Sequence, residues 1–166
     1  MALPNIFVAI ILAICLFMAQ ESEAIRTKMD QRLRFLVPHN MARAKEHLPM
    51  VRWNETVAAY AKAYAQERAV DCALQHSTTR VYGENIAMST GDLRPALAVK
   101  LWVGEKPDYH YGPNTCTGGK MCGHYTQVVW KDTTSIGCAS ARCQNGGTFV
   151  TCNYYPPGNY IGERPF

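Results

Sequence analysis

The stretch SIGCASARCQNGGTFVTCNY, residues 135–154, contains the clearest secondary-structure signal in the chain. Two runs rich in strand-forming residues, Ser135–Arg142 and Thr148–Tyr154, flank the turn sequence NGG at 145–147. An Asn-Gly pair between two such runs is a strong signal for a β-hairpin. Immediately upstream, TQVVW at 126–130 predicts a further strand, buried or half-buried, with its tryptophan in the core. We therefore expect the C-terminal part of the chain to form a sheet.

Upstream of this sheet the pattern favours helices. The first helix is expected within Lys28–Ala44, where apolar residues recur at helical spacing and Pro38 should kink or split the helix. The second is expected over Glu55–Ala69, directly after Asn54, a residue type that caps helix N-termini. The expected apolar faces are Met29, Leu33, Leu36 and Val37 in the first helix, and Val57, Ala61, Tyr64, Ala65 and Ala69 in the second.

A third helix and a long loop complete the prediction. The helix begins near Asp92, tolerates Pro95 in its first turn and stops at Gly104. Residues 106–123 are rich in Gly, Pro, Tyr and Cys and predict one long loop. Helices followed by a hairpin-rich sheet indicate an α+β domain in which helices cover an antiparallel sheet. The core stripe expected in the third helix is Leu93, Leu97, Ala98, Leu101 and Trp102.

Residues 1–24 are interpreted as a secretory signal peptide. The apolar run at 6–19 is shorter than a membrane-spanning helix, and SEA at 22–24 supplies the pattern after which signal peptidase cuts. Both features oppose the alternative, an N-terminal membrane anchor. We expect a mature chain 25–166 that lacks a transmembrane segment and is exported. In such a chain Asn54 begins a glycosylation acceptor sequence, although an asparagine that caps a helix is a poorer acceptor.

Cysteine count and charge agree with export. Cys15 lies in the signal, and the remaining six cysteines form an even set that predicts three disulfides. Six cysteines allow fifteen pairings, and of these Cys116 with Cys122 would close a small loop. The mature chain keeps 17 basic and 11 acidic residues, a net charge of +6, because Glu21 and Glu23 leave with the signal. This charge favours anionic surfaces such as cell walls, and no basic cluster indicates a nucleic-acid partner.

Five short segments stand out in chain order: FLVPHN at 35–40, YGENIA at 82–87, WVGEK at 102–106, CGHYTQVVW at 122–130 and CNYYPPGNY at 152–160. Together they resemble the motifs of the plant pathogenesis-related protein 1 family. That family belongs to the CAP superfamily, which groups cysteine-rich secretory proteins, antigen 5 and pathogenesis-related 1. The resemblance runs over essentially the whole mature chain, and several motifs in the same order are far more specific than one.

The resemblance implies a fold and a biological role. The fold is a three-layer α-β-α sandwich with an antiparallel sheet, formed by one CAP domain over residues 25–166. The role is that of a secreted plant defence protein, not an enzyme, which acts in the apoplast and restrains fungal or oomycete growth. The disulfides carried over by position are Cys72–Cys143, Cys116–Cys122 and Cys138–Cys152.

A central cleft is a further implication of the resemblance. Its lining would be His76, Glu84, Glu105 and His124, two imidazoles and two carboxylates. Such groups form a candidate Zn²⁺ site, and they equally suit a hydrogen-bonded polar network that requires no cofactor. The alternative function is therefore a metal-dependent hydrolase or protease. The sequence contains no H-E-x-x-H motif and no G-x-S-x-G nucleophile, and oxidised cysteines would leave the mature chain no thiolate.

The loop that contains Tyr109, Tyr111 and Pro113 is a candidate lipid site. In the resembling family this loop is associated with sterol capture. Aromatic faces beside a glycine-proline segment can cover a rigid ring system, and burial of a sterol-sized apolar surface is favourable. The alternative is that the two tyrosines only pack the loop onto the helices.

The tail at 156–166 fits the family's pattern for a releasable signalling peptide. The resemblance implies cleavage between Tyr155 and Pro156, after which the peptide would meet a receptor. The two prolines at 156 and 157 favour an extended and accessible junction. Phe166 departs from the family's usual terminal tyrosine and so lacks a phenolic hydroxyl that a receptor would recognise. The alternative is that the tail wraps the sheet.

Overall fold

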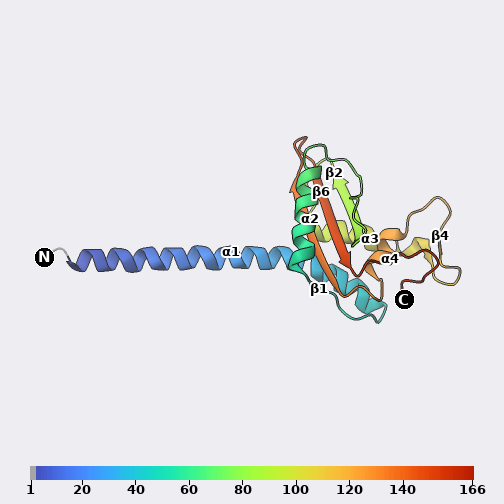
Figure 1. Ribbon diagram of the computed structural model, residues 1–166, viewed down its shortest axis with the longest axis horizontal. Coiled ribbons are helices and arrows are strands. Elements are labelled where there is room, and N and C mark those ends of the chain that lie inside the picture. The colour runs from blue at the N-terminus through green and yellow to red at the C-terminus, as the bar shows by residue number, and fades with distance from the viewer. Residues whose placement is uncertain (1–2) are drawn as a thin grey trace. The chain divides into compact units, whose positions relative to one another are not determined.

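The computed structural model describes the backbone of residues 3–166 and the side chains of residues 8–27 and 29–166. It divides into two units, residues 1–33 and 34–166. The first unit consists of the N-terminal part of α1 (Leu3–Lys45), shown in blue in Figure 1. Within the described residues, this is the one helix long and apolar enough to cross a membrane, a property that signal sequences share. Cleavage after Ala24 stays a prediction.

The second unit contains a four-stranded sheet in the order β1-β5-β6-β2. These strands are β1 (Arg52–Trp53), β2 (Gly83–Ser89), β5 (Ser135–Arg142) and β6 (Thr148–Tyr155). The predicted hairpin is confirmed, since β5 and β6 pair antiparallel across the NGG turn. β2 also pairs antiparallel with β6, but β1 runs parallel to β5. The expectation of a purely antiparallel sheet is therefore wrong at one edge, and the sheet is mixed.

α2 (Glu55–Arg68) crosses one face of the β5–β6 hairpin, as Figure 1 shows. Its start is fixed by Asn54, whose Oδ1 accepts hydrogen bonds from the backbone N–H groups of Thr56 and Val57. The helix lies so close to the sheet that a Cβ at Gly137 would collide with its backbone. The predicted second helix is thus confirmed together with its cap. The cap uses the side-chain oxygen of Asn54, so the side-chain nitrogen takes no part in it. Glycosylation of Asn54 stays a prediction.

Both faces of the sheet are covered. Phe149 on β6 packs against α2, while Val150 and Tyr154 of the same strand belong to a core on the opposite face. That second core also includes residues of α1, α3 (Pro95–Val103) and α4 (Gly123–Val128). The alternation along β6 therefore builds two apolar layers, and the three-layer α-β-α sandwich is confirmed.

Two helices differ from their predicted faces and limits. α1 continues through Pro38 without a break, so the predicted split is wrong. Its buried positions include His39 and Arg43, polar residues that a search for apolar residues at helical spacing does not detect. Three of the four predicted core positions are instead about half exposed: Met29, Leu33 and Val37. α3 begins at Pro95 and not near Asp92. It buries Ala98, Val99 and Trp102, while Leu97 and Leu101 are exposed.

The buried guanidinium of Arg43 explains why a charged residue occupies the core side of α1. It donates to four backbone carbonyls, those of Pro49, Val128, Trp130 and Thr133, at 2.8–3.1 Å. Burial lowers its pKa to about 10, which leaves the group protonated at neutral pH. Three of these carbonyls come from the end of α4 and the turn after it, and the fourth comes from the segment between α1 and β1. Arg43 therefore ties these segments together.

The prediction of a strand over TQVVW is wrong, because residues 123–128 form α4. All residues from Tyr125 to Trp130 are buried, so the segment has no exposed positions whose spacing would distinguish a helix from a strand. The prediction that Trp130 belongs to the core is confirmed, since it is 1% exposed. The predicted long loop contains a short helix, η1 (Lys106–Asp108), and a two-stranded sheet of β3 (Tyr109–His110) and β4 (Thr115–Cys116).

Three disulfides join the elements of the domain. Their pairing, Cys72–Cys143, Cys116–Cys122 and Cys138–Cys152, is the one that the resemblance implied. The first ties the segment after α2 to the β5–β6 turn, the second ties β4 to the start of α4, and the third crosses the hairpin. Each cross-link of this kind contributes on the order of 2–4 kcal/mol to stability.

Candidate functional site

The four cleft residues form two separate His–Glu pairs. His76, on the segment between α2 and β2, places its Nδ1 2.9 Å from Oε1 of Glu84 on β2. His124, in the first turn of α4, places its Nδ1 2.6 Å from Oε1 of Glu105 after α3. No group of three or more His, Cys, Asp or Glu side chains within the described part of the chain is arranged to hold a metal ion. The single tetrad implied by the resemblance is thus resolved into two pairs.

Glu84 is the fixed member of the first pair. Its Oε1 accepts from the backbone N–H of Ser77 at 2.8 Å, and its Oε2 accepts from the Ser77 hydroxyl at 2.6 Å and from Nδ2 of Asn153 at 3.1 Å. Burial alone would raise the pKa of Glu84, but the hydrogen bonds from His76, Ser77 and Asn153 outweigh it and lower the pKa. The carboxylate is therefore anionic at neutral pH.

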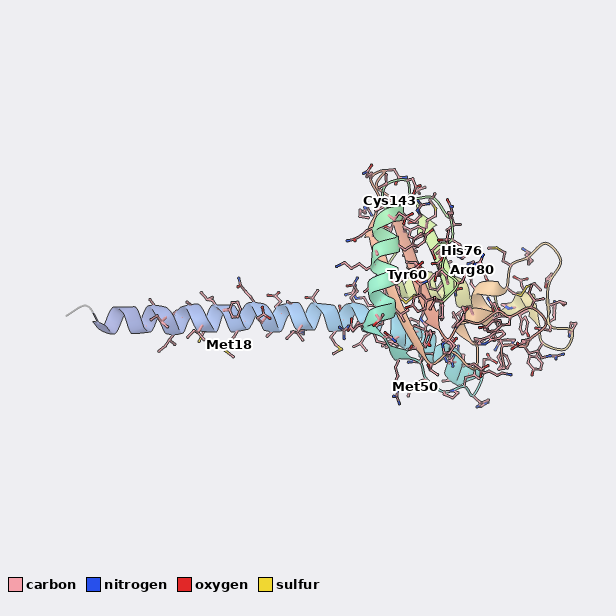
Figure 2. All side chains as sticks on the ribbon, viewed as in Figure 1. Met18, Met50, Tyr60, His76, Arg80 and Cys143 are labelled. Atoms are coloured by element: carbon pink, nitrogen blue, oxygen red, sulfur yellow. A yellow bond between two sulfur atoms is a disulfide. The ribbon has the colours of Figure 1, made fainter. Side chains whose placement is uncertain are left out.

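His76 is the outward member of the same pair. Its side chain is 58% exposed, against 6% for Glu84. It borders a small hollow of about 180 Å³ that Tyr60 and Tyr64 of α2 also line. Figure 2 shows Tyr60 on α2 and His76 on the segment that follows that helix. Because Nδ1–H of His76 donates to the Glu84 carboxylate, the lone pair of a neutral His76 ring is on Nε2.

The second pair is held on several sides. Oε2 of Glu105 accepts from the backbone N–H groups of His124 at 3.0 Å and Tyr125 at 3.3 Å, so the carboxylate also caps α4. The indole of Trp102 stacks on the His124 ring with centroids 6.3 Å apart. Nδ2 of Asn85 donates to the backbone carbonyl of His124 at 2.9 Å. This pair is embedded in the domain, with both side chains less than one-fifth exposed.

A buried hydrogen-bond chain supports His124 from α1. Nδ1 of His39 donates to the carbonyl of Phe35 at 2.8 Å, so its Nε2 accepts from the hydroxyl of Tyr154 at 2.9 Å. That hydroxyl oxygen in turn accepts from Nδ2 of Asn85 at 3.0 Å. Burial lowers the pKa of His39 to about 4 and raises the pKa of Tyr154, so the chain is neutral.

Sequence reasoning did not assign roles to these supporting residues. The motifs FLVPHN and YGENIA contain His39 and Asn85, so the signal that pointed to them was the resemblance. Asn153 likewise lies in the motif CNYYPPGNY, whereas Ser77 lies outside every motif. Their contacts to Glu84 exist only because the fold brings together segments far apart in the chain.

The aromatic loop has one tyrosine turned inward and one turned outward. Tyr109 is half-buried, packs against Tyr125 and donates its hydroxyl to Oδ1 of Asn114 at 2.8 Å. Tyr111 is 48% exposed, and Pro113 is exposed as well. A cavity of about 270 Å³ adjoins the loop and is lined by Tyr109, Trp130 and residues of the tail.

The tail at 156–166 leaves the sheet and returns to this loop. Figure 1 shows the dark red end of the chain extending from β6 toward the segment that carries β4. The Phe166 ring stacks on Tyr111, with centroids 5.2 Å apart. The alternative that the tail wraps the sheet is therefore wrong for the terminal residues. Tyr155, at the expected cleavage junction, is 46% exposed.

Comparison with known proteins agrees with the fold and the motifs. Residues 36–154 match the family model described as CAP, the cysteine-rich secretory protein family, which defines the class of the domain. The chain is 49% identical over 164 residues to a pathogenesis-related protein PR-1 type of Sambucus nigra, covering 98% of this chain and 96% of that protein. It is 54% identical over 134 residues to pathogenesis-related protein PR-1 of Medicago truncatula, with coverages of 80% and 77%. The chain therefore belongs to the pathogenesis-related 1 family, a family of plant defence proteins.

Solved structures support the same fold. The crystal structure of NaASP2 with Zn²⁺ superposes with a TM-score of 0.67 at 27% identity, covering 81% of this chain and 84% of that chain. Venom allergen-like protein 4 of Schistosoma mansoni superposes with a TM-score of 0.68 at 25% identity, with coverages of 82% and 92%.

Proposed function

We propose that this protein is a secreted, non-enzymatic defence protein that binds a sterol or related lipid in the apoplast and thereby restrains fungal or oomycete growth. The observation that carries the proposal is the aromatic loop, which presents Tyr111 at the surface beside a cavity that Tyr109 and Trp130 line. The apolar N-terminal helix and the +6 charge of residues 25–166 support export to an anionic wall.

A planar ring system suits this loop for a physical reason. Aromatic faces match the flat surface of a sterol, and each square ångström of apolar surface removed from water contributes about 25 cal/mol. An exposed tyrosine provides such a face and keeps its hydroxyl in water. The loop therefore combines an apolar contact with a polar rim, as many small-molecule sites do.

Equilibrium binding of a fluorescent sterol to the mature chain 25–166 tests the proposal. We expect saturable binding that Tyr111→Ser weakens severalfold. Tyr155→Ser is the matched control, because Tyr155 has a similar exposure (46% against 48%) and lies outside the loop. The proposal fails if binding is absent, or if both substitutions weaken it equally.

We further propose that residues 156–166 are released as a defence peptide that a receptor recognises. The exposure of Tyr155 and of residues 159–164 supports access by a protease. Mass spectrometry of protein secreted by its native tissue tests this proposal. A product that ends at Tyr155 supports it, and an intact C-terminus in tissue under microbial challenge contradicts it. The same spectra report the N-terminus and any glycan on Asn54.

A zinc-dependent hydrolase is the second candidate function, since the related NaASP2 was solved with Zn²⁺. The donor set here does not fit a catalytic zinc centre, because each imidazole is engaged by its own glutamate and no third donor joins either pair in the described residues. We propose instead that the pairs are a polar network that requires no cofactor. Stoichiometric zinc by metal analysis, together with a peptidase activity that His124→Ala abolishes, would overturn this.

A further inference from the structure

The end of the tail clamps the aromatic loop. Beyond the Phe166–Tyr111 stack, the Arg164 guanidinium lies 5.6 Å from the Tyr111 ring centroid. Arg164 also donates to the backbone carbonyls of Tyr111 at 3.2 Å and Gly112 at 2.8 Å. From the loop side, Nδ2 of Asn114 donates to the carbonyl of Glu163 at 3.0 Å. The contacts run in both directions, so the tail and the loop hold each other.

The start of the tail covers Trp130. The Tyr160 ring packs on the Trp130 indole, with centroids 6.0 Å apart. The backbone at Gly158 lies so close that a Cβ there would collide with the indole ring. Beneath this cover Trp130 is 1% exposed, and its Nε1 has no hydrogen-bond partner among the described residues. Large apolar surface and one unpaired donor are thus sealed by residues of the tail.

Polar contacts hold the tail in place along its length. The Asn159 side chain accepts from Thr126 at 2.7 Å and donates to the carbonyl of Gly123 at 2.8 Å, which attaches it to α4. The backbone N–H of Lys131 donates to the carbonyl of Pro165 at 2.6 Å, and Pro165 is buried. The 270 Å³ cavity therefore has one wall from the domain and the other from the tail.

We propose that residues 156–166 are a removable cover over one apolar site, formed by Tyr109, Tyr111 and Trp130, and that their release opens this site to a planar apolar ligand. The inference rests on the proposed function, which assigns lipid binding to the loop and release to the tail. The new element is that lipid binding and release of the tail involve the same surface. The uncut protein is then the form that binds the ligand weakly, and the cut protein is the form that binds it tightly.

Release requires one hydrolytic step. Water adds across the Tyr155–Pro156 amide bond, which leaves a carboxylate on Tyr155 and a secondary ammonium group on Pro156, and a separate protease catalyses the step. While the tail is attached, its effective concentration at the loop is on the order of millimolar. After hydrolysis that advantage disappears, and the contacts described above are left to a short peptide at high dilution. The tail therefore dissociates once it is cut.

The full mature chain tests the cover without any truncation. Phe166→Ala removes the stacking ring, and Phe166→Tyr is the matched control because it retains the ring. The probe is 8-anilinonaphthalene-1-sulfonate, which fluoresces on exposed apolar surface. We expect severalfold higher dye fluorescence for Phe166→Ala than for the wild type and Phe166→Tyr, at unchanged melting temperature. Equal fluorescence for all three proteins overturns the cover.

A fluorescent sterol on the same three proteins separates this inference from the proposed function. Tighter sterol binding by Phe166→Ala alone supports the cover. Equal sterol binding by all three overturns the cover and leaves lipid binding intact. If no protein binds sterol but the dye still distinguishes Phe166→Ala, the cover stands for another apolar ligand and sterol binding fails. Arg164→Ala provides a second variant, and it should act in the same direction because it removes two hydrogen bonds to the loop.

Discussion

The two His–Glu pairs use the same side chains in opposite ways. In the pair of His76 with Glu84 the carboxylate is buried and the imidazole is 58% exposed, whereas in the pair of His124 with Glu105 both side chains are largely enclosed. In the first pair, the Glu84 carboxylate is fixed inside the domain and holds the His76 imidazole at the surface. The second pair holds the start of a helix. Two pairs of the same residue types therefore have different roles. Each role depends on which side chains of the pair are buried.

The largest effect should come from the enclosed pair. We expect Glu105→Ala to lower the free energy of unfolding by about 2–3 kcal/mol, because three donors around His124 and Tyr125 lose their acceptor. Urea denaturation measures this change. Glu105→Gln keeps one acceptor oxygen and should recover part of the loss. A loss no larger than that of His76→Ala would contradict the structural role of this pair.

Loss of the Glu84 charge in the pair with His76 should cause a smaller change in the free energy of unfolding, and this change should depend on pH. Glu84→Gln should cost about 1 kcal/mol at pH 7, because the hydrogen bonds to the carboxylate weaken. The pKa of Glu84 is lowered by folding, so its contribution is present above the ordinary value of 4.5 and is lost as the pH falls through the lowered pKa. Urea denaturation across this range should show the wild type and Glu84→Gln converging in acid. A difference that stays constant with pH would contradict the charge-based explanation.

The smallest effect should come from the outward imidazole. His76→Ala should change the free energy of unfolding by less than about 0.5 kcal/mol, as surface substitutions usually do. His124→Ala is the matched comparison and should cost more, because its ring is stacked and enclosed. Thermal denaturation of the two variants side by side measures the difference. Equal losses would remove the distinction between the two pairs.

The parts of the fold that sequence predicted are those where local signals are strong. The NGG turn predicted the hairpin, and Asn54 predicted the start of α2. The strand over TQVVW was wrong because every residue there is buried, and the face of α1 was wrong because Arg43 and His39 occupy it. β2 was not predicted. It is a strand because it pairs with β6, and this pairing exists only in the assembled sheet.

The site was predictable only as a list of residues. The resemblance supplied the two histidines and two glutamates, but their division into pairs depends on burial, which a linear pattern does not contain. The loop and the tail were assigned separately, and their contact through Tyr111 and Phe166 joins residues more than fifty positions apart. Pairing of this kind arises from tertiary packing.

Arg43 has a consequence for how α4 tolerates change. The guanidinium holds main-chain oxygens, and every amino acid supplies the same oxygen at a given position. The anchoring is therefore indifferent to which side chains α4 carries. A substitution in the buried run 125–130 can therefore change the local packing without removing a backbone acceptor of Arg43.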